Sequence, residues 1–205
     1  MKKILCYGDS NTFGFNPKDF SRYDKNTRWT GILQSNLGEE YQVINEGANN
    51  RTGFTDNPQG ELYSAQKHYP KLISQMKDID IIILSIGTND LQFLYNINSD
   101  AIEQGLEKLI TISKTKTNNI IIIPPVKLSE NILKGFFNNQ FDQASIEKSQ
   151  TAGEIYIKLA KNHECKIFDI NEFTHPSISD GLHYSEESHK LIADKLTEFI
   201  LFQKF

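Results

Sequence analysis

The chain has 205 residues, 38% of them hydrophobic and 23% charged, which fits a single globular domain over residues 1–205 with a core of full size. Its formal net charge of −4 gives no general reason to expect nucleic acid or an anionic membrane as a partner. No stretch approaches the ~20 apolar residues of a membrane-spanning helix, and the apolar run behind Lys2 and Lys3 is too short for the core of a secretory signal.

Five short runs rich in β-branched residues predict strands along the chain. The third and fourth runs each contain four consecutive isoleucine or leucine residues, which is typical of strands that are covered on both faces. The predicted strands span residues 4–7, 41–45, 79–86, 119–123 and 166–170.

Longer segments with apolar residues at helical spacing separate these runs. The predicted helices span residues 30–37, 64–76, 99–116, 145–162 and 185–202. Glu186 and Glu187 lie in the first turn of the last helix, where acidic residues are favoured. Strands that alternate with helices predict a parallel sheet with right-handed crossovers, and therefore a three-layer α/β/α sandwich around five strands.

One region, residues 127–142, fits this alternation poorly. It carries Phe136, Phe137 and Phe141 among polar residues. We consider a packed excursion, a wall of the substrate pocket and a contact between subunits.

The two cysteines, Cys6 and Cys165, fall in or beside predicted strands. Such positions favour buried, reduced thiols over a disulfide, and the cytoplasm is then the default location. Four histidines do not combine with acids or thiols at a metal-ligand spacing, so we expect no metal site. They are His68, His163, His175 and His189.

Polar clusters follow several of the predicted strands. They are GDSNT at residues 8–12, EGANNRT at 46–52, GTND at 87–90 and DGLH at 180–183. Each alone is compatible with a turn or a helix cap. A parallel sheet, however, gathers the residues that follow its strands at one edge, so we expect these clusters to lie together.

Four side chains in these clusters have complementary chemistry. A serine becomes a nucleophile when a base takes its proton, and His183 supplies an imidazole for Ser10. Asp180 lies three residues before that imidazole and can orient it, while Asn89 can offer an amide N–H to an oxyanion. Because no Gly-x-Ser-x-Gly motif surrounds Ser10, the sequence argues against an α/β-hydrolase fold.

The clusters at residues 8–12, 87–90 and 180–183, in this order and at these strand ends, resemble blocks I, III and V of the SGNH (GDSL-type) hydrolases. The resemblance covers nearly the whole chain. Residues 28–30 (RWT) and 51–52 (RT) are similar to the arylesterase and acyltransferase branch, whose members resemble lysophospholipase L1-type esterases. This resemblance implies a flavodoxin-like sheet and ester hydrolysis through an acyl-enzyme, without a metal or cofactor.

The resemblance also implies roles for individual residues. Ser10 would be the nucleophile and a backbone N–H donor to the oxyanion, His183 the general base, and Asp180 its orienting partner. Asn89 would donate its side-chain amide to the oxyanion. The second glycine of the family's oxyanion hole falls on Asn50 in this sequence.

Asparagine stands where the family has this glycine, so we consider two donors for this part of the site. Asparagine tolerates a left-handed backbone better than most residues, so the Asn50 N–H can still point into the site. Gly47 is the alternative donor if the loop is shifted.

Four further residues in or near these blocks have more modest expected roles. Asp9 is expected to bond loop amides, and Asp90 to cap or brace its turn. Arg51 is expected either to brace a local acid or to bind a substrate carboxylate or phosphate. Trp29 is expected either to line the acyl pocket or to anchor the first long helix.

The function that we predict is a serine esterase that hydrolyses carboxylic esters of small or medium acyl groups, with acyl transfer to alcohols as a further activity. The substrate is thus a small-molecule ester, without nucleic acid or membrane partners. The alternatives are a deacetylase of carbohydrate acetyl esters and a flavodoxin-like binding module that holds a phosphate on residues 10–12, although Asp9 would repel that phosphate. Related esterases assemble, so we also consider a homo-oligomer, with Phe136, Phe137 and Phe141 as candidate contacts.

Overall fold

The strands of the chain form one parallel sheet. A computed structural model, which describes residues 1–203 and 205, places them in the order β2-β1-β3-β4-β5. The strands are β1 (Lys2–Gly8), β2 (Tyr41–Gly47), β3 (Ile81–Ser85), β4 (Ile120–Ile122) and β5 (Lys166–Ile167). All neighbouring strands pair in parallel, so the predicted five-stranded parallel sheet is confirmed.

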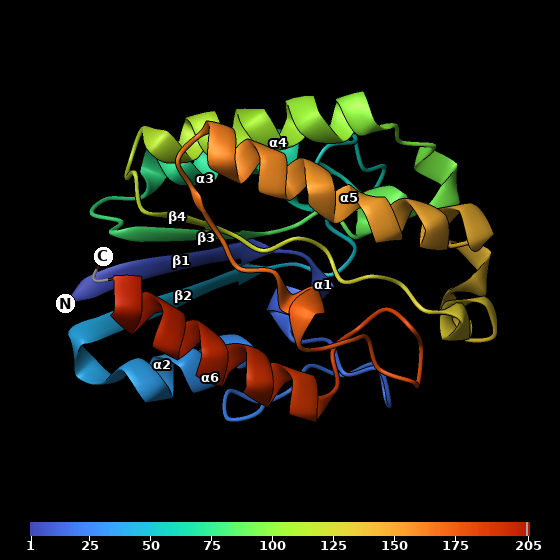
Figure 1. Ribbon diagram of the computed structural model, residues 1–205, viewed down its shortest axis with the longest axis horizontal. Coiled ribbons are helices and arrows are strands. Elements are labelled where there is room, and N and C mark those ends of the chain that lie inside the picture. The colour runs from blue at the N-terminus through green and yellow to red at the C-terminus, as the bar shows by residue number, and fades with distance from the viewer. Residues whose placement is uncertain (204) are drawn as a thin grey trace.

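Helices cover both faces of this sheet, as Figure 1 shows. The helices α3, α4 and α5 lie above the sheet in that view and α2 and α6 lie below it, while α1 follows the end of β1. Their bounds are α1 (Ser10–Phe13), α2 (Trp29–Leu37), α3 (Ala65–Gln75), α4 (Ser99–Lys114), α5 (Gln143–Asn162) and α6 (Glu186–Gln203). The predicted three-layer α/β/α sandwich is therefore confirmed. Within residues 1–203 and 205, none of the helices combines the length and the apolar character needed to cross a membrane.

Alternate side chains of the strands enter two separate cores. Leu5 and Ile82 belong to the core under α3, α4 and α5, whereas Ile4 and Ile81 belong to the core under α2 and α6. Because successive side chains of a strand point to opposite faces and both faces are buried here, the strands are apolar at nearly every position.

The sheet changes its direction of winding at β1. The chain passes from β1 to β2 on one side of it and returns to β3 on the other side. In sheets of this kind a crevice opens at the carboxyl ends of the strands where the order reverses. The segment that directly follows β1, beginning at Asp9, therefore lies at the position where a binding site is expected.

Three predicted strands are longer than the observed ones, and the fourth covers Ile120–Ile122 rather than residues 119–123. The third begins at Ile81 rather than at residue 79, and the fifth has two residues rather than five. The fifth ends early because Asp169 caps a 3₁₀ turn, in which its carboxylate accepts the N–H of Asn171 at 3.0 Å.

The segment over residues 127–142 folds into two 3₁₀ turns, Glu130–Leu133 and Phe136–Asn139. Its residues Ile132 and Phe141 pack with Leu182 in a third, smaller core. The segment is thus a packed excursion. Since Phe141 is buried inside the chain, it is not free for the contact between subunits that the sequence suggested.

Candidate active site

Ser10 stands at the first position of the short helix α1, directly after β1. The side chain of Asp9 caps this helix by accepting the N–H of Asn11 at 3.0 Å, so its predicted role toward the loop amides is observed. A Cβ atom at Gly8 would lie 2.1 Å from Thr12 Oγ1 and 2.3 Å from Ser85 O. The turn that presents Ser10 therefore needs a glycine at position 8.

The structure brings Ser10, His183 and Asp180 into one hydrogen-bonded chain. His183 Nε2 lies 2.9 Å from Ser10 Oγ, and His183 Nδ1 lies 2.6 Å from Asp180 Oδ2. Because a carboxylate can only accept, the Nδ1–H donates to Asp180 and leaves Nε2 free to accept the Ser10 hydroxyl proton. All three side chains are buried, with at most 6% of each residue exposed.

Asp180 also orders the loop that carries His183. Its Oδ1 accepts the backbone N–H groups of Leu182 and His183, each at 3.0 Å. Burial raises the pKa of the Asp180 carboxyl, but the hydrogen bonds and charge of His183 together with these N–H groups outweigh it and hold the pKa below its usual value. Asp180 is thus ionised at neutral pH.

Asn11 is a site residue to which the sequence analysis assigned no role of its own. Its Oδ1 accepts the N–H of Tyr184 at 3.0 Å, and its Nδ2 donates to Leu182 O at 3.4 Å. These bonds tie both neighbours of His183 to the loop that holds Ser10. The position of Asn11 directly after Ser10 was the available signal, but its partners lie 171 and 173 residues away along the chain.

The two remaining predicted site residues, Asn50 and Asn89, line the same pocket as Ser10. Asn89 Nδ2 donates to Arg51 O at 3.0 Å, which uses one of its two N–H groups. Asn50 has a left-handed backbone with φ of 58°. Its backbone N–H has no acceptor among residues 1–203 and 205, whereas the N–H of Gly47 already donates to Asn45 Oδ1 at 3.0 Å.

The pocket at Ser10 has a volume of about 200 Å³ and is lined by both amide and aromatic side chains. Five of the lining residues are asparagines or glutamines and three are phenylalanines. Its lining residues are Ser10, Phe15, Asn49, Asn50, Gln59, Asn89, Phe137, Gln140, Phe141, Leu182 and His183. Three of them come from the segment over residues 127–142, so that segment is also a pocket wall, as the second of its predicted roles required.

Phe15 and Phe137 pack against the imidazole of His183. Their ring centroids lie 4.3 and 5.3 Å from the centroid of the imidazole. The aromatic surface continues outward to Phe20 and Phe136, whose centroids are 5.0 Å apart and which are 52% and 66% exposed. An apolar face therefore runs from His183 to solvent.

Arg51 has neither of the roles predicted for it. Its guanidinium donates to the backbone carbonyl oxygens of Gly8, Glu46 and Leu62 and stacks 4.5 Å from the centroid of the Tyr7 ring. Arg51 is 1% exposed, so it cannot bind a substrate anion, and its partners are carbonyl groups rather than a local acid. It fixes the loop after β2 to the end of β1.

Asp90 and Trp29 are structural residues beside the pocket. Asp90 accepts the N–H groups of Gly53, Phe54 and Thr55, so it braces the neighbouring loop rather than its own turn. Burial nevertheless raises the pKa of Asp90 to about 6. Trp29 is 1% exposed and donates through Nε1 to Asn11 O at 3.1 Å, which makes it the anchor of α2 rather than a wall of the pocket.

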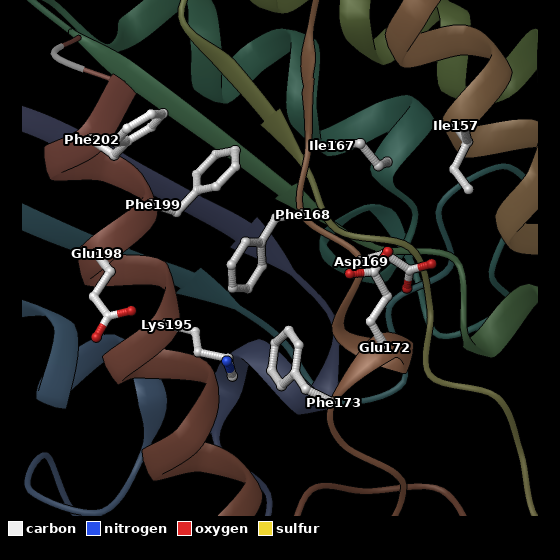
Figure 2. A pocket seen from close by; sticks show the side chains of 10 residues that line it. All are labelled: Ile157, Ile167, Phe168, Asp169, Glu172, Phe173, Lys195, Glu198, Phe199 and Phe202. Atoms are coloured by element: carbon white, nitrogen blue, oxygen red, sulfur yellow. The ribbon is translucent and has the colours of Figure 1, made fainter.

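A larger cavity of about 720 Å³ lies elsewhere, beside the edge strand β5. Figure 2 shows the rings of Phe168, Phe173 and Phe199 around it, with Lys195 and Glu198 on α6. Its lining contains no serine, cysteine or histidine that could act as a nucleophile or base. Among the described residues, no cluster of three or more histidine, cysteine or acidic side chains is arranged to hold a metal ion.

Known proteins share both the motifs and the fold of this chain. A model of the GDSL-like lipase/acylhydrolase family matches residues 6–191. The inhibitor-bound aryl esterase of M. smegmatis has 25% identity over 98% of this chain and 99% of its own, with a TM-score of 0.91. A carbohydrate acetylesterase from Sinorhizobium meliloti has 25% identity over 99% of this chain and 100% of its own, with a TM-score of 0.88. No curated protein matches the chain.

The family match spans the loop of Ser10 at one end and the loop of His183 at the other. The two esterase structures align with nearly the whole of this chain, so the correspondence includes the sheet, the helices on both of its faces and the loops at its carboxyl edge. The chain belongs to the GDSL-like lipase/acylhydrolase family and is a serine ester hydrolase of the SGNH type.

Proposed function

We propose that the protein hydrolyses carboxylic esters of short acyl groups through an acyl-enzyme on Ser10. The observation that carries this proposal is the buried chain from Asp180 through His183 to the Ser10 hydroxyl, with distances of 2.6 and 2.9 Å. Nucleophile, base and orienting carboxylate within hydrogen-bond reach of one another are the arrangement that acyl transfer to a serine needs.

In the first step His183 Nε2 takes the Ser10 proton as Ser10 Oγ attacks the ester carbonyl carbon. The carbonyl oxygen becomes an oxyanion, for which the donors are the backbone N–H groups of Ser10 and Asn50 and the second amide N–H of Asn89. His183 then gives the proton to the leaving alcohol. In the second half of the reaction, water attacks the acyl-enzyme and His183 acts as base again.

The size of the pocket supports a short acyl group. Its volume of about 200 Å³ lies below the ~300–1,000 Å³ of pockets that enclose drug-sized ligands. The polar amide groups of Asn49 and Gln59 also line this pocket, and they would be poor partners for a long alkyl chain. Activity should therefore fall steeply once the acyl chain exceeds about four carbons.

The aromatic face from Phe15 to Phe136 supports an apolar or aromatic leaving group. Aryl rings stack favourably on such side chains at centroid distances of about 4.5–7 Å. One similar structure is an aryl esterase, which agrees with this choice, and another is a carbohydrate acetylesterase. The lining residue Gln140 supports acetylated sugars as the second candidate, because amide side chains bond sugar hydroxyl groups.

A substrate panel tests the proposal. Nitrophenyl esters of two to sixteen carbons and acetylated sugars are compared for the wild type and Ser10→Ala, with an added alcohol to detect transfer of the acyl group. We expect nitrophenyl acetate and butyrate to be turned over fastest and Ser10→Ala to be inactive. Hydrolysis by Ser10→Ala at the wild-type rate would disprove the mechanism, whereas a wild-type protein that hydrolyses none of these esters would revive the binding-module alternative.

We also propose that the protein acts in the cytoplasm. The thiol of Cys6 is buried and that of Cys165 is half-buried, and both are free, which supports a reducing compartment. Cell fractionation with an antibody against the chain tests this location, and recovery from the medium would contradict it.

A further inference from the structure

Gln92 joins the two asparagines of the pocket wall. Its Nε2 donates to Asn50 Oδ1 at 2.9 Å and to Asn89 Oδ1 at 3.1 Å. Both N–H groups of the Gln92 amide are therefore used, one for each asparagine. Gln92 is 3% exposed and does not line the pocket, so it acts on these residues from behind the wall.

The local structure explains why Gln92 reaches Asn89. The two residues lie at either end of a 3₁₀ turn, in which the Gln92 N–H bonds to Asn89 O at 3.2 Å. Side chains three residues apart in a 3₁₀ turn lie above one another, so the amide of Gln92 is placed against that of Asn89.

One backbone carbonyl fixes the direction of every bond in this chain of amides. Arg51 O can only accept, so the atom of Asn89 that faces it must be Nδ2. The Oδ1 atom of Asn89 therefore faces Gln92, and the Gln92 atom that bonds to it must be the donor Nε2. The second N–H of this Nε2 group donates to Asn50 Oδ1. None of the three amides can flip without leaving two like atoms in contact.

We propose that Gln92 is a positioning residue of the oxyanion site, which holds Asn89 and Asn50 in the orientation that presents their N–H groups to the substrate carbonyl oxygen. The inference rests on the proposed function, in which these two residues are oxyanion donors. A left-handed asparagine is strained relative to glycine, and the bond from Gln92 restrains Asn50 at its φ of 58°. Gln92 thus stabilises an asparagine at the position where the family pattern has glycine.

The test uses Gln92→Met, which keeps the length of the side chain and removes its donors, and Gln92→Glu, which replaces the Nε2 donor by an oxygen and can keep at most one of the two donated bonds. With nitrophenyl acetate we expect kcat to fall about tenfold or more for both variants while KM changes less than twofold, because the lost orientation matters most in the transition state. The affinity for a boronic acid, which forms a tetrahedral adduct on serine, should fall by a similar factor. The exposed Gln75 at the end of α3 supplies the matched control Gln75→Met, for which we expect no change.

A double-mutant cycle separates positioning from general destabilisation. Because Gln92 acts in part through Asn89, adding Gln92→Met to Asn89→Ala should lower kcat by a smaller factor than Gln92→Met does in the wild type, since one of the two groups that it positions is already gone. Melting temperatures establish whether the variants are folded. If Gln92→Met does not fold, the kcat of Gln92→Glu tests the inference instead. A folded variant with kcat within twofold of the wild type, or the full loss repeated in the Asn89→Ala background, would overturn the inference. Ser10→Ala is measured in parallel: if it is inactive while Gln92→Met is fully active, the inference alone fails, and if Ser10→Ala stays active the proposed function fails.

Discussion

The imidazole of His183 is held by hydrogen bonds at both of its ring nitrogens and by packing against two aromatic rings. Asp180 fixes Nδ1, Ser10 lies at Nε2, and Phe15 and Phe137 restrict the ring from the aromatic side. The tautomer that can take a proton from serine is therefore set by a single carboxylate. That dependence makes Asp180 the most informative residue to change.

Replacing Asp180 by asparagine should leave the fold intact and lower kcat by about 10³–10⁴-fold. An amide can face Nδ1 with its oxygen or its NH₂ group, and in the second case the imidazole carries its proton on Nε2, where it cannot accept from Ser10. Steady-state kinetics with nitrophenyl acetate, with circular dichroism as a check of folding, measure this effect. A loss of less than about tenfold would mean that Asp180 does not orient His183.

Asn11 should behave differently, because it positions the histidine loop without touching the imidazole. Asn11→Ala removes the bonds to Leu182 O and to the N–H of Tyr184 and leaves that N–H unpaired. We expect kcat to fall about tenfold and stability to fall by about 1–3 kcal/mol. Kinetics and urea unfolding measure both quantities. Wild-type values in both would show that the loop is held by Asp180 alone.

The roles of the hydrogen-bonding side chains at this site could be predicted only for residues that belong to a sequence motif. Ser10, Asn89, Asp180 and His183 follow strands at the spacing of the family, so the chemistry of each was open to sequence reasoning. The role of Asn11 depends on partners 171 and 173 residues away, and that of Gln92 depends on Asn50, 42 residues away, as well as on its near neighbour Asn89, so no local pattern encodes either role in full.

Among the elements, α6 carries a feature that links stability to pH. His189 is buried on this helix, and its Nδ1 accepts the N–H of Trp29 at 3.2 Å. Burial, with a smaller contribution from the charge of His183, lowers the pKa of His189 to about 3. The folded protein therefore keeps this imidazole neutral at a pH where the unfolded chain would protonate it.

The consequence is a loss of stability in acid. Between pH 6.5 and about 3 the unfolded state binds one more proton at this residue than the folded state, so the free energy of unfolding falls as the pH falls. From pH 7.0 to 4.5 the contribution of His189 should be about 2–3 kcal/mol, at ~1.4 kcal/mol per pH unit. The asparagine of His189→Asn can still accept the N–H of Trp29 and does not titrate. Between pH 7.0 and 4.5 the unfolding free energy of this variant should therefore fall by about 2–3 kcal/mol less than that of the wild type. Equal acid sensitivity in urea unfolding of the two proteins would contradict this assignment.

At the scale of the whole molecule, the site results from the order of the strands. The loops that follow β1, β2 and β3 lie side by side because these strands are neighbours, and the long loop before α6 returns His183 to the same edge. Arg51 ties the loop after β2 to the end of β1, and Asp90 ties the same loop to the segment that follows β3. The convergence of residues that lie far apart in sequence is thus a property of the parallel sheet.

Much of this architecture could be predicted from the sequence, because fully buried strands have a distinctive apolar pattern. The ends of β3 and β5 could not, since they depend on turns such as the one capped by Asp169. The structural role of Arg51 could not be predicted either, because its partners are backbone carbonyl groups, which every residue possesses. Nor does the polar segment over residues 127–142 reveal that its phenylalanines divide between a small core and the wall of the pocket.

Covalent labelling of the serine tests the central claim most directly. A fluorophosphonate reacts with an activated serine and leaves a stable adduct that peptide mass spectrometry can assign to a single residue. We predict one adduct, on Ser10, formed at least about 10³-fold more slowly in His183→Ala than in the wild type. An adduct on a different serine, or labelling of Ser10 at an unchanged rate in His183→Ala, would contradict the account.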